Sequence, residues 1–311
     1  MSPSLYLGAD IGGTKIDAVL TDEAGEPLAQ RRVLTPAQQG PRAVLDAVVA
    51  ALAELRALAP ADATVRGAGI GTHGVVTYPE GVVAAASQAL PGWTGTPLRE
   101  AVADRLGLPV FVDNDVNVLA YGELALGAGR GHRDLVFVTV GTGVGGAVIA
   151  GGQIVRGRHG SGGEVGHAPS AAAAGLPCSC GATGHLDAIA SGTAIQRAYA
   201  EAAALAAGPG TSRIMELAAL GDPIARQVVG VAAGALGEAI AGLVSVLDPA
   251  LVIVAGGVAA SGATFWDPMR HAVRTSTLPL LREVRMVRPG LGQAGAALGA
   301  AALARDELTL T

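Results

Sequence analysis

The stretch Leu5-Tyr6-Leu7-Gly8-Ala9-Asp10-Ile11-Gly12-Gly13-Thr14-Lys15 decides the fold of this chain. Its apolar run ends at Asp10, a glycine turn follows, and a second apolar run, Ile16–Leu20, leads away from the turn. Turn residues at 22–27 and a third run, Leu28–Leu34, complete the pattern. The succession predicts a strand, a glycine turn, a returning strand and a hairpin to a third strand.

The same pattern returns in the middle of the chain. The apolar run Leu135–Val140 leads into Gly141-Thr142-Gly143-Val144-Gly145-Gly146, and Ala147–Ala150 leads back. Gly141 lies 131 residues after Asp10, and repetition at this distance predicts two similar α/β halves rather than a solenoid. A third junction between an apolar strand and glycines occurs at 252–257.

A strand that runs into a glycine-rich turn exposes backbone N–H groups with no Cβ in the way, so phosphate oxygens can approach closely. One such turn alone is equally well explained as a hairpin that needs positive φ. Three in one chain, the first of them between Asp10 and the only lysine, Lys15, favour a nucleotide held between two hairpins. None of the three has the spacing of a Walker loop or of the dinucleotide fingerprint.

Composition excludes several classes of protein. The chain has 311 residues, 50% of them hydrophobic and 15% charged, which suits two folded domains and excludes a disordered chain. A net charge of -5 argues against nucleic acid as the main partner, because duplex binding needs a basic face. The two cysteines, Cys178 and Cys180, are too close in sequence for an easy disulfide and are expected to be reduced thiols or metal ligands.

No segment is predicted to enter or cross a membrane. The N-terminus lacks the basic and long apolar regions of a secretory signal. The most apolar stretch, 228–247, carries Glu238 at its middle and is rich in Ala and Gly, so a buried helix explains it better than a membrane span. We therefore expect a soluble, cytoplasmic protein.

Five motifs together resemble those of one family. Asp10–Lys15, Asp113-Asn114-Asp115-Val116-Asn117, Gly141–Gly146, Gly163-Glu164-Val165-Gly166-His167 and Cys178–Gly184 occur in the order typical of the ROK family of repressors and sugar kinases. The resemblance covers essentially the whole chain. It implies the actin-like (ribonuclease H-like) ATPase fold, with two α/β domains around a nucleotide and sugar cleft. The expected domains are 1–112, joined by a C-terminal helix within 294–311, and a larger domain, 113–293, with a zinc loop.

The resemblance also implies an activity: ATP-dependent phosphorylation of the C6 hydroxyl of a hexose, with glucose favoured. An N-acetylhexosamine kinase, for N-acetylmannosamine or N-acetylglucosamine, is an alternative. A sugar-responsive transcriptional regulator of the same family is disfavoured, because the first glycine loop begins at residue 10 and leaves no room for a helix-turn-helix. Relatives are often homodimers. Polyphosphate remains an alternative phosphoryl donor.

The phosphoryl-transfer residues follow from the motifs of the family. Asp115 resembles the general base that accepts the C6 hydroxyl proton, and Asn114 resembles a residue that binds sugar hydroxyls. A turn that ends a strand explains the same Asn and Asp without any function. Asp10 resembles the carboxylate that positions Mg²⁺ with ATP. The residues expected to hold ATP and its phosphates are Gly12, Gly13, Thr14, Lys15, Gly141, Thr142, Gly143, Gly256 and Gly257.

A zinc site is expected from the spacing His167-x10-Cys178-x-Cys180-x4-His185, because tetrahedral Zn²⁺ takes four nitrogen or sulfur ligands. The family has a third Cys where this chain has His185, and two thiolates then neutralise the ion. Loop cysteines without any metal are the alternative.

The expected sugar-binding residues are Glu164, His167, Asp187, Asn114 and Gly74. Three departures from the family pattern cluster around the sugar: Asp187 in place of Glu, Ala89 in place of Asn, and His73 in place of Pro. None of the three is expected to touch the phosphate loops. ATP-dependent transfer is therefore the firmer expectation, and the identity of the hexose is left open.

Overall fold

The computed structural model describes residues 2–310, with side chains up to Thr309, and the chain divides into two units. The first unit runs to Gly131 and includes Gly152–Gly162 and the segment from Pro289 onward; the second comprises His132–Gly151 and Gly163–Arg288. The first division falls at Gly131 rather than after residue 112, where the sequence places it. The reason is a long-range contact: helix α3 (Asp115–Ala125) packs against helix α9 (Gly295–Leu310) and stays with the first unit.

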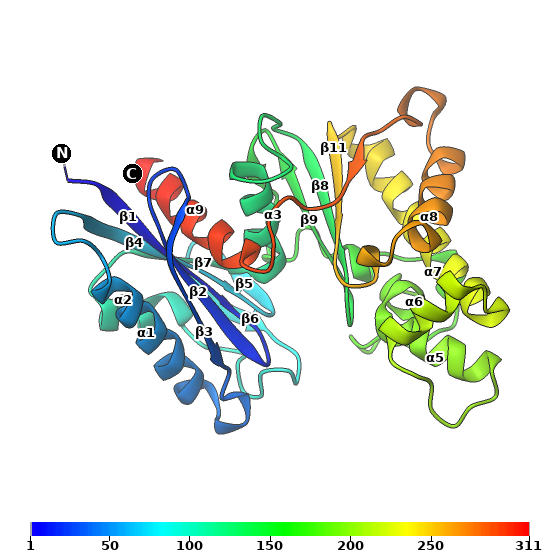
Figure 1. Ribbon diagram of the computed structural model, residues 1–311, viewed down its shortest axis with the longest axis horizontal. Helices are drawn as coiled ribbons and strands as arrows, with labels where there is room; N and C mark the ends of the chain where they lie inside the picture. Colours follow the sequence, from blue (N-terminus) through cyan, green and yellow to red (C-terminus); the bar gives the residue numbers. More distant parts are fainter. Residues whose placement is uncertain (1, 311) are drawn as a thin grey trace. The chain divides into compact units, whose positions relative to one another are not determined.

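The first unit is built on a five-stranded sheet of order β3-β2-β1-β4-β7 (Figure 1). The strand β1 pairs antiparallel with β2 and β2 pairs antiparallel with β3, as the glycine turn and hairpin in the sequence predict, whereas β1–β4 and β4–β7 are parallel. The strands are β1 (Ser4–Ile11), β2 (Lys15–Thr21), β3 (Pro27–Leu34), β4 (Thr64–Thr72) and β7 (Val110–Asn114).

Helices cover both faces of this sheet (Figure 1). Leu5, Leu7 and Ala9 of β1 share a core with α1 (Pro41–Ala57) and α2 (Leu98–Leu106). Tyr6, whose side chain points to the opposite face, packs with Ala297 and Ala301 of α9. A small sheet of β5 (Val75–Thr77) and β6 (Val82–Ala85), for which the sequence gives no clear signal, completes the unit.

The helix α9 lies against the backbone of the sheet. A Cβ at Gly69 would lie 1.8 Å from the carbonyl oxygen of Ala300, and one at Gly8 would lie 2.0 Å from that of Ala297. Only glycine fits at such distances, so these two positions allow the helix to close over β1 and β4.

The second unit repeats the same plan with a sheet of order β10-β9-β8-β11-β12. The pair β8–β9 is the predicted antiparallel hairpin, and β11 runs parallel to β8 and β12. The prediction of two similar α/β halves is therefore confirmed. The strands are β8 (Leu135–Val140), β9 (Val144–Ala150), β10 (Gln153–Ile154), β11 (Leu251–Ala255) and β12 (Met286–Val287).

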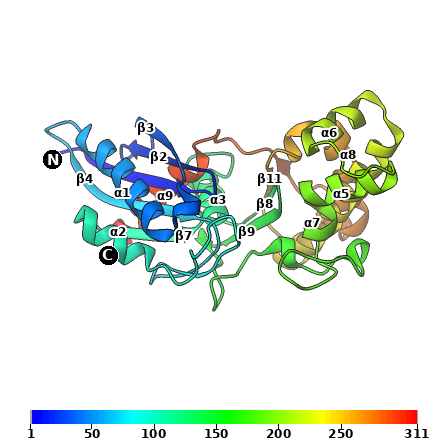
Figure 2. The same cartoon turned by 90° about the horizontal axis from the view of Figure 1, so that it is seen from below.

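Helices α4 to α8 gather on the second unit (Figure 2). They are α4 (Asp187–Ala190), α5 (Gly192–Ala202), α6 (Thr211–Leu220), α7 (Pro223–Leu247) and α8 (Ala263–Ser276). By length and composition α7 could cross a membrane, but 56% of its most apolar stretch is buried and it packs against α8, α6, α5 and α4. It is the central helix of the core of the second unit, as expected for 228–247.

The substitution Gly69→Ala tests the contact between α9 and the sheet. The added Cβ would overlap the Ala300 carbonyl, so we expect the free energy of unfolding to fall by about 1–3 kcal/mol or more. Gly234→Ala in α7 is the control, because among the described residues no atom outside its own helix lies within 4 Å of its Cβ position, and Ala favours a helix by up to about 1 kcal/mol. Urea denaturation measures both, and an unchanged midpoint for Gly69→Ala would contradict the packing described.

Candidate active site

Two carboxylates meet at the carboxyl-terminal edge of the first sheet. Asp10 lies near the end of β1, and Asp115 begins α3 directly after β7. Gly71 on β4 lies next to both, because a Cβ there would be 3.6 Å from Asp10 Oδ1 and 3.4 Å from the Cα of Asp115. Parallel strands end at the same edge of a sheet, which is where α/β proteins bind ligands.

Asp10 is held in an environment that disfavours its charge. Burial, and then the charges of Asp115 and Asp17, raise its pKa from 3.8 to about 7, while Lys15 opposes the shift. Its Oδ1 atom is buried and has no hydrogen-bond partner among residues 2–309. An unpartnered carboxylate oxygen beside a second carboxylate suits a hard cation such as Mg²⁺.

The turn after Asp10 is a tight hairpin whose backbone is held by one hydrogen bond within the turn and one from a side chain outside it. Gly12 N donates to Lys15 O at 3.0 Å, and the hydroxyl of Thr35 donates to Gly12 O at 2.7 Å. The Lys15 ammonium lies 3.0 Å from Asp17, and the Lys15 side chain as a whole is 45% exposed, so it is accessible to an anion from solvent.

Asn114 is the N-cap of α3. Its Oδ1 accepts hydrogen bonds from Val116 N at 2.8 Å and Asn117 N at 3.2 Å, and its Nδ2 donates to Gly74 O at 2.9 Å. The interpretation of this segment as a turn that ends a strand is therefore correct, and it does not exclude a function. An amide nitrogen carries two hydrogens, so one N–H of Asn114 can still serve a ligand.

The two glycine turns of the second unit lie at the same end of its sheet. A Cβ at Gly256 would lie 2.2 Å from Val140 O, at the end of β8, and Gly256 has φ +95. Gly192 N, at the start of α5, donates to Gly141 O at 2.9 Å, and the Thr193 hydroxyl donates to Thr142 O at 3.0 Å. The amino-terminal end of α5 thus abuts the Gly141–Gly143 turn, as phosphate-binding turns often do.

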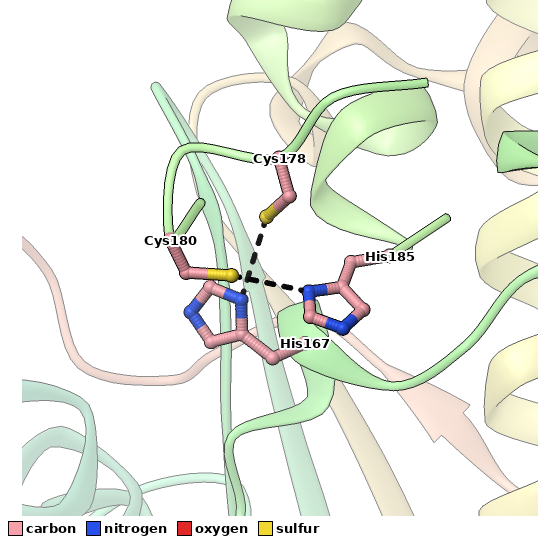
Figure 3. A group of neighbouring side chains, drawn as sticks. All are labelled: His167, Cys178, Cys180 and His185. Atoms are coloured by element: carbon pink, nitrogen blue, oxygen red, sulfur yellow. Dashed lines mark hydrogen bonds between the residues drawn. The ribbon is translucent and has the colours of Figure 1, made fainter. Parts of the chain in front are cut away.

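Two histidines and two cysteines point toward one another in the loop that precedes α4 (Figure 3). One ligand atom from each lies within 4.8 Å of the others. His167 Nδ1 is 3.6 Å from Cys178 Sγ, and His185 Nδ1 is 3.3 Å from Cys180 Sγ. Nitrogen and sulfur ligands of a tetrahedral Zn²⁺ lie about 3.6 Å apart, given the usual bond lengths. The four predicted ligands are therefore brought together with spacings that fit zinc.

The remaining predicted sugar-binding residues flank this cluster. Glu164 Oε2 lies 4.0 Å from His167 Nε2, the ring nitrogen that faces away from the cysteines. Asp187 accepts a hydrogen bond from Val144 N at 2.8 Å, so its carboxylate stabilises the turn between β8 and β9. Sequence reasoning gives Asp187 a contact with sugar and misses this contact with the protein.

The expectation that the three departures avoid the phosphate loops is wrong. Val144, which Asp187 binds, directly follows the Gly141–Gly143 turn. A Cβ at Gly13 would lie 3.1 Å from the Cβ of Ala89, so the Ala89 loop lies against the first turn. His73 Nε2 lies 2.7 Å from the Ser87 hydroxyl and fixes this same loop. The sequence does not reveal these contacts, because folding brings together segments that are far apart in sequence.

Two residues next to the site, Asp113 and Arg156, are not among the site residues predicted from the sequence. Asp113 is buried and forms an ion pair with Arg156 at 2.6 Å. Asp113 lies within a quoted motif, but the burial that reveals its role is not visible in the sequence. Arg156 belongs to no motif.

The raised pKa of Asp10 predicts how stability depends on pH. Between pH 4 and 7 Asp10 binds a proton in the folded protein but releases it in the unfolded chain. Proton binding by Asp10 therefore stabilises the folded state at low pH, and this stabilisation is lost as pH rises through 7. Above pH 7 the buried Asp10 carboxylate is charged and destabilises the folded state, and Asp10→Asn removes this charge. We expect the substitution to raise the free energy of unfolding of the metal-free protein by about 1–3 kcal/mol at pH 8, and by less at pH 5. Urea denaturation in EDTA measures the difference; an equal gain at both pH values would contradict it.

Comparisons with known proteins agree with one another. The family model described as "ROK family" matches residues 6–307. A glucokinase of Streptomyces coelicolor is 36% identical and covers 97% of this chain and 98% of its own length.

Two crystal structures are similar over nearly the full length. A ROK hexokinase from Thermus thermophilus has a TM-score of 0.87 at 34% identity, covering 99% of this chain and 100% of its own. A ROK family glucokinase from Streptomyces griseus in complex with glucose and AMPPNP has a TM-score of 0.80 at 37% identity, covering 97% and 99%. The predicted fold class is confirmed. The chain belongs to the ROK family and has the actin-like ATPase fold, with two α/β domains.

Proposed function

We propose that this chain is an ATP-dependent kinase that phosphorylates the C6 hydroxyl of glucose. One observation carries the proposal: Asp10 and Asp115 stand together beside the Gly12-Gly13 turn, in a chain 37% identical to a glucokinase whose structure contains glucose and AMPPNP. Carboxylates next to a phosphate-binding turn are the groups that phosphoryl transfer to a hydroxyl requires.

Asp115 is the proposed general base. As the first residue of α3 it is held by the capped turn, and its carboxylate would accept the proton of the C6 hydroxyl as that oxygen attacks the γ-phosphorus. Asp10 would hold Mg²⁺, directly or through water, and the ion would neutralise charge on the phosphates. The pKa of about 7 for Asp10 without a cation means that cation binding would release a proton near neutral pH.

The nucleotide would be bound mainly by backbone N–H groups. Gly12, Gly13 and Thr14 with Lys15 would receive phosphates on the first unit, and Gly141, Thr142 and Gly143 would do so on the second. Apart from Gly257 itself and its two chain neighbours, no described residue has an atom within 4 Å of a Cβ built at Gly257, and this open space next to Gly256 supports adenosine binding there.

The hexose would be bound by Asn114, Gly74, Glu164, His167 and Asp187. The second N–H of the Asn114 amide and the partly exposed imidazole of His167 are donors that suit sugar hydroxyls. Structural Zn²⁺ would be held by His167, Cys178, Cys180 and His185 and would fix the ring of His167. By resemblance to the family, we also propose a cytoplasmic homodimer, which light scattering would test.

The substitution Asp115→Asn tests the general base. The amide cannot accept a proton, so kcat for glucose should fall at least about 10²-fold, while the Kd for glucose should stay near that of the wild type. A coupled assay and calorimetry measure the two quantities. Asp104→Asn on the exposed surface of α2 is the matched control and should leave kcat unchanged. Near-native turnover by Asp115→Asn would rule out the assignment.

Elemental analysis of protein purified without added metal tests the zinc site. We expect about one zinc ion per chain. Cys178→Ser should lose the metal and weaken glucose binding, because His167 would no longer be held. Ser179→Ala, between the two cysteines, should keep the metal. Wild-type protein that is free of metal but fully active would refute the site.

A further inference from the structure

The segment Gly152–Gly162 belongs to the first unit, although it lies between two pieces of the second in sequence. One close backbone contact attaches the segment to β5, and one hydrogen bond closes the segment on itself. A Cβ at Gly160 would lie 2.2 Å from Val76 O of β5, and Gly162 N donates to Arg156 O at 2.7 Å. These contacts fold the segment into a loop that presents Arg156 to the end of β7.

Arg156 is held from two sides. Its Nε donates to Asp113 Oδ2 at 2.6 Å, and its guanidinium lies 3.6 Å above the centre of the Tyr78 ring. The side chain of Arg156 is 15% exposed and that of Asp113 is 3% exposed. An ion pair this well buried is a fixed contact, unlike a mobile surface pair.

The other oxygen of Asp113 reaches the first turn of α3. Asp113 Oδ1 accepts a hydrogen bond from Asn114 N at 2.8 Å and another from Asn117 Nδ2 at 2.7 Å. Asp115 lies between these two residues in the chain. One continuous set of contacts therefore runs from the guanidinium of Arg156 through Asp113 to the turn that carries Asp115.

This arrangement depends on Arg156. Among residues 2–309, it is the one cation within ion-pair distance of Asp113. Without it, a buried carboxylate next to Asp115 would lose its counter-charge, and it would have to take up a proton or move toward water. Either change would alter the hydrogen bonds that Asp113 offers to Asn114 and Asn117.

We propose that Arg156 is a positioning residue for phosphoryl transfer, which sets the place of the Asp115 carboxylate through Asp113. The proposal rests on the proposed function, in which Asp115 accepts the hydroxyl proton. In this proposal Arg156 acts through Asp113 and is assigned no contact with substrate. Its removal therefore affects the rate of the chemical step more than the binding of ATP, whose proposed ligands lie on other turns.

The substitution Arg156→Ala is the main test. We expect kcat to fall about 10–100-fold, because small misplacements of reacting groups have effects of this size, while KM for ATP changes less than about threefold. Guanidinium ion at low millimolar concentration should restore part of the lost kcat by occupying the vacated space. Arg156→Lys should be intermediate, since it returns the charge but not the planar contact with Tyr78.

Arg99→Ala is the matched control. Arg99 donates to Pro79 O at 2.9 Å, in the same loop as Tyr78, but has no contact with Asp113. It should keep a near-native kcat and should not respond to guanidinium. Arg156→Ala that folds and retains native kcat would overturn the proposal. A loss of kcat with no rescue by guanidinium in either Arg156 variant would show a merely structural role and would also overturn it.

A measurement without catalysis separates this proposal from the proposed function. The NMR signals of the Asn117 side-chain amide should shift in Arg156→Ala and move back when guanidinium is added. Signals that do not move would overturn the proposal, whatever the activity. If they move as expected but the wild type phosphorylates no hexose, the network described here stands and the proposed function fails.

Discussion

The balance of charge at the end of the first sheet is the constraint on which the candidate active site depends. Asp17 is paired with Lys15 and Arg32, and Asp113 is paired with Arg156. Asp10 keeps a buried oxygen that has no hydrogen-bond partner in the described part of the chain. The cations of the site are thus paired with the carboxylates of Asp17 and Asp113. Asp10 has a high pKa because its negative charge is not balanced in this way, and a bound metal ion would supply the missing positive charge.

Glycine serves two different purposes in this fold. At Gly8 and Gly69 the absence of a Cβ lets the backbone of α9 lie against the sheet. In the turns after β1, β8 and β11, it leaves N–H groups accessible and, at Gly256, permits positive φ. The first use brings strands and helices close together, and the second leaves a surface to which anions can bind. A chain that contains 46 glycines can meet both needs without longer loops.

The strands β1 and β8 were predictable because each is a short apolar run that leads into a glycine turn, whereas β5 and β6 give no such signal. The cluster of His167, Cys178, Cys180 and His185 was predictable because the donor types and the spacing of these residues are distinctive. The boundary at Gly131 was not, since it depends on α3 packing against α9, far away in sequence. Arg156 was missed for the same reason: it meets Asp113 across 43 residues and lies in no motif. The course of α8 was also difficult to predict, because this helix contains Pro268 and proline usually ends helices.

The position of α9 affects how the protein is made. During translation Asp10 and β1 leave the ribosome early, but the helix that covers β1 and β4 comes from the last part of the chain. All of the second unit, which ends at Arg288, is synthesised before that helix. Domains generally fold as units, so the second unit can finish folding while one face of the first sheet is still open to solvent and to chaperones. The sheet of the first unit, whose strands precede the second unit in sequence, therefore receives its α9 layer only after the whole second unit has been synthesised.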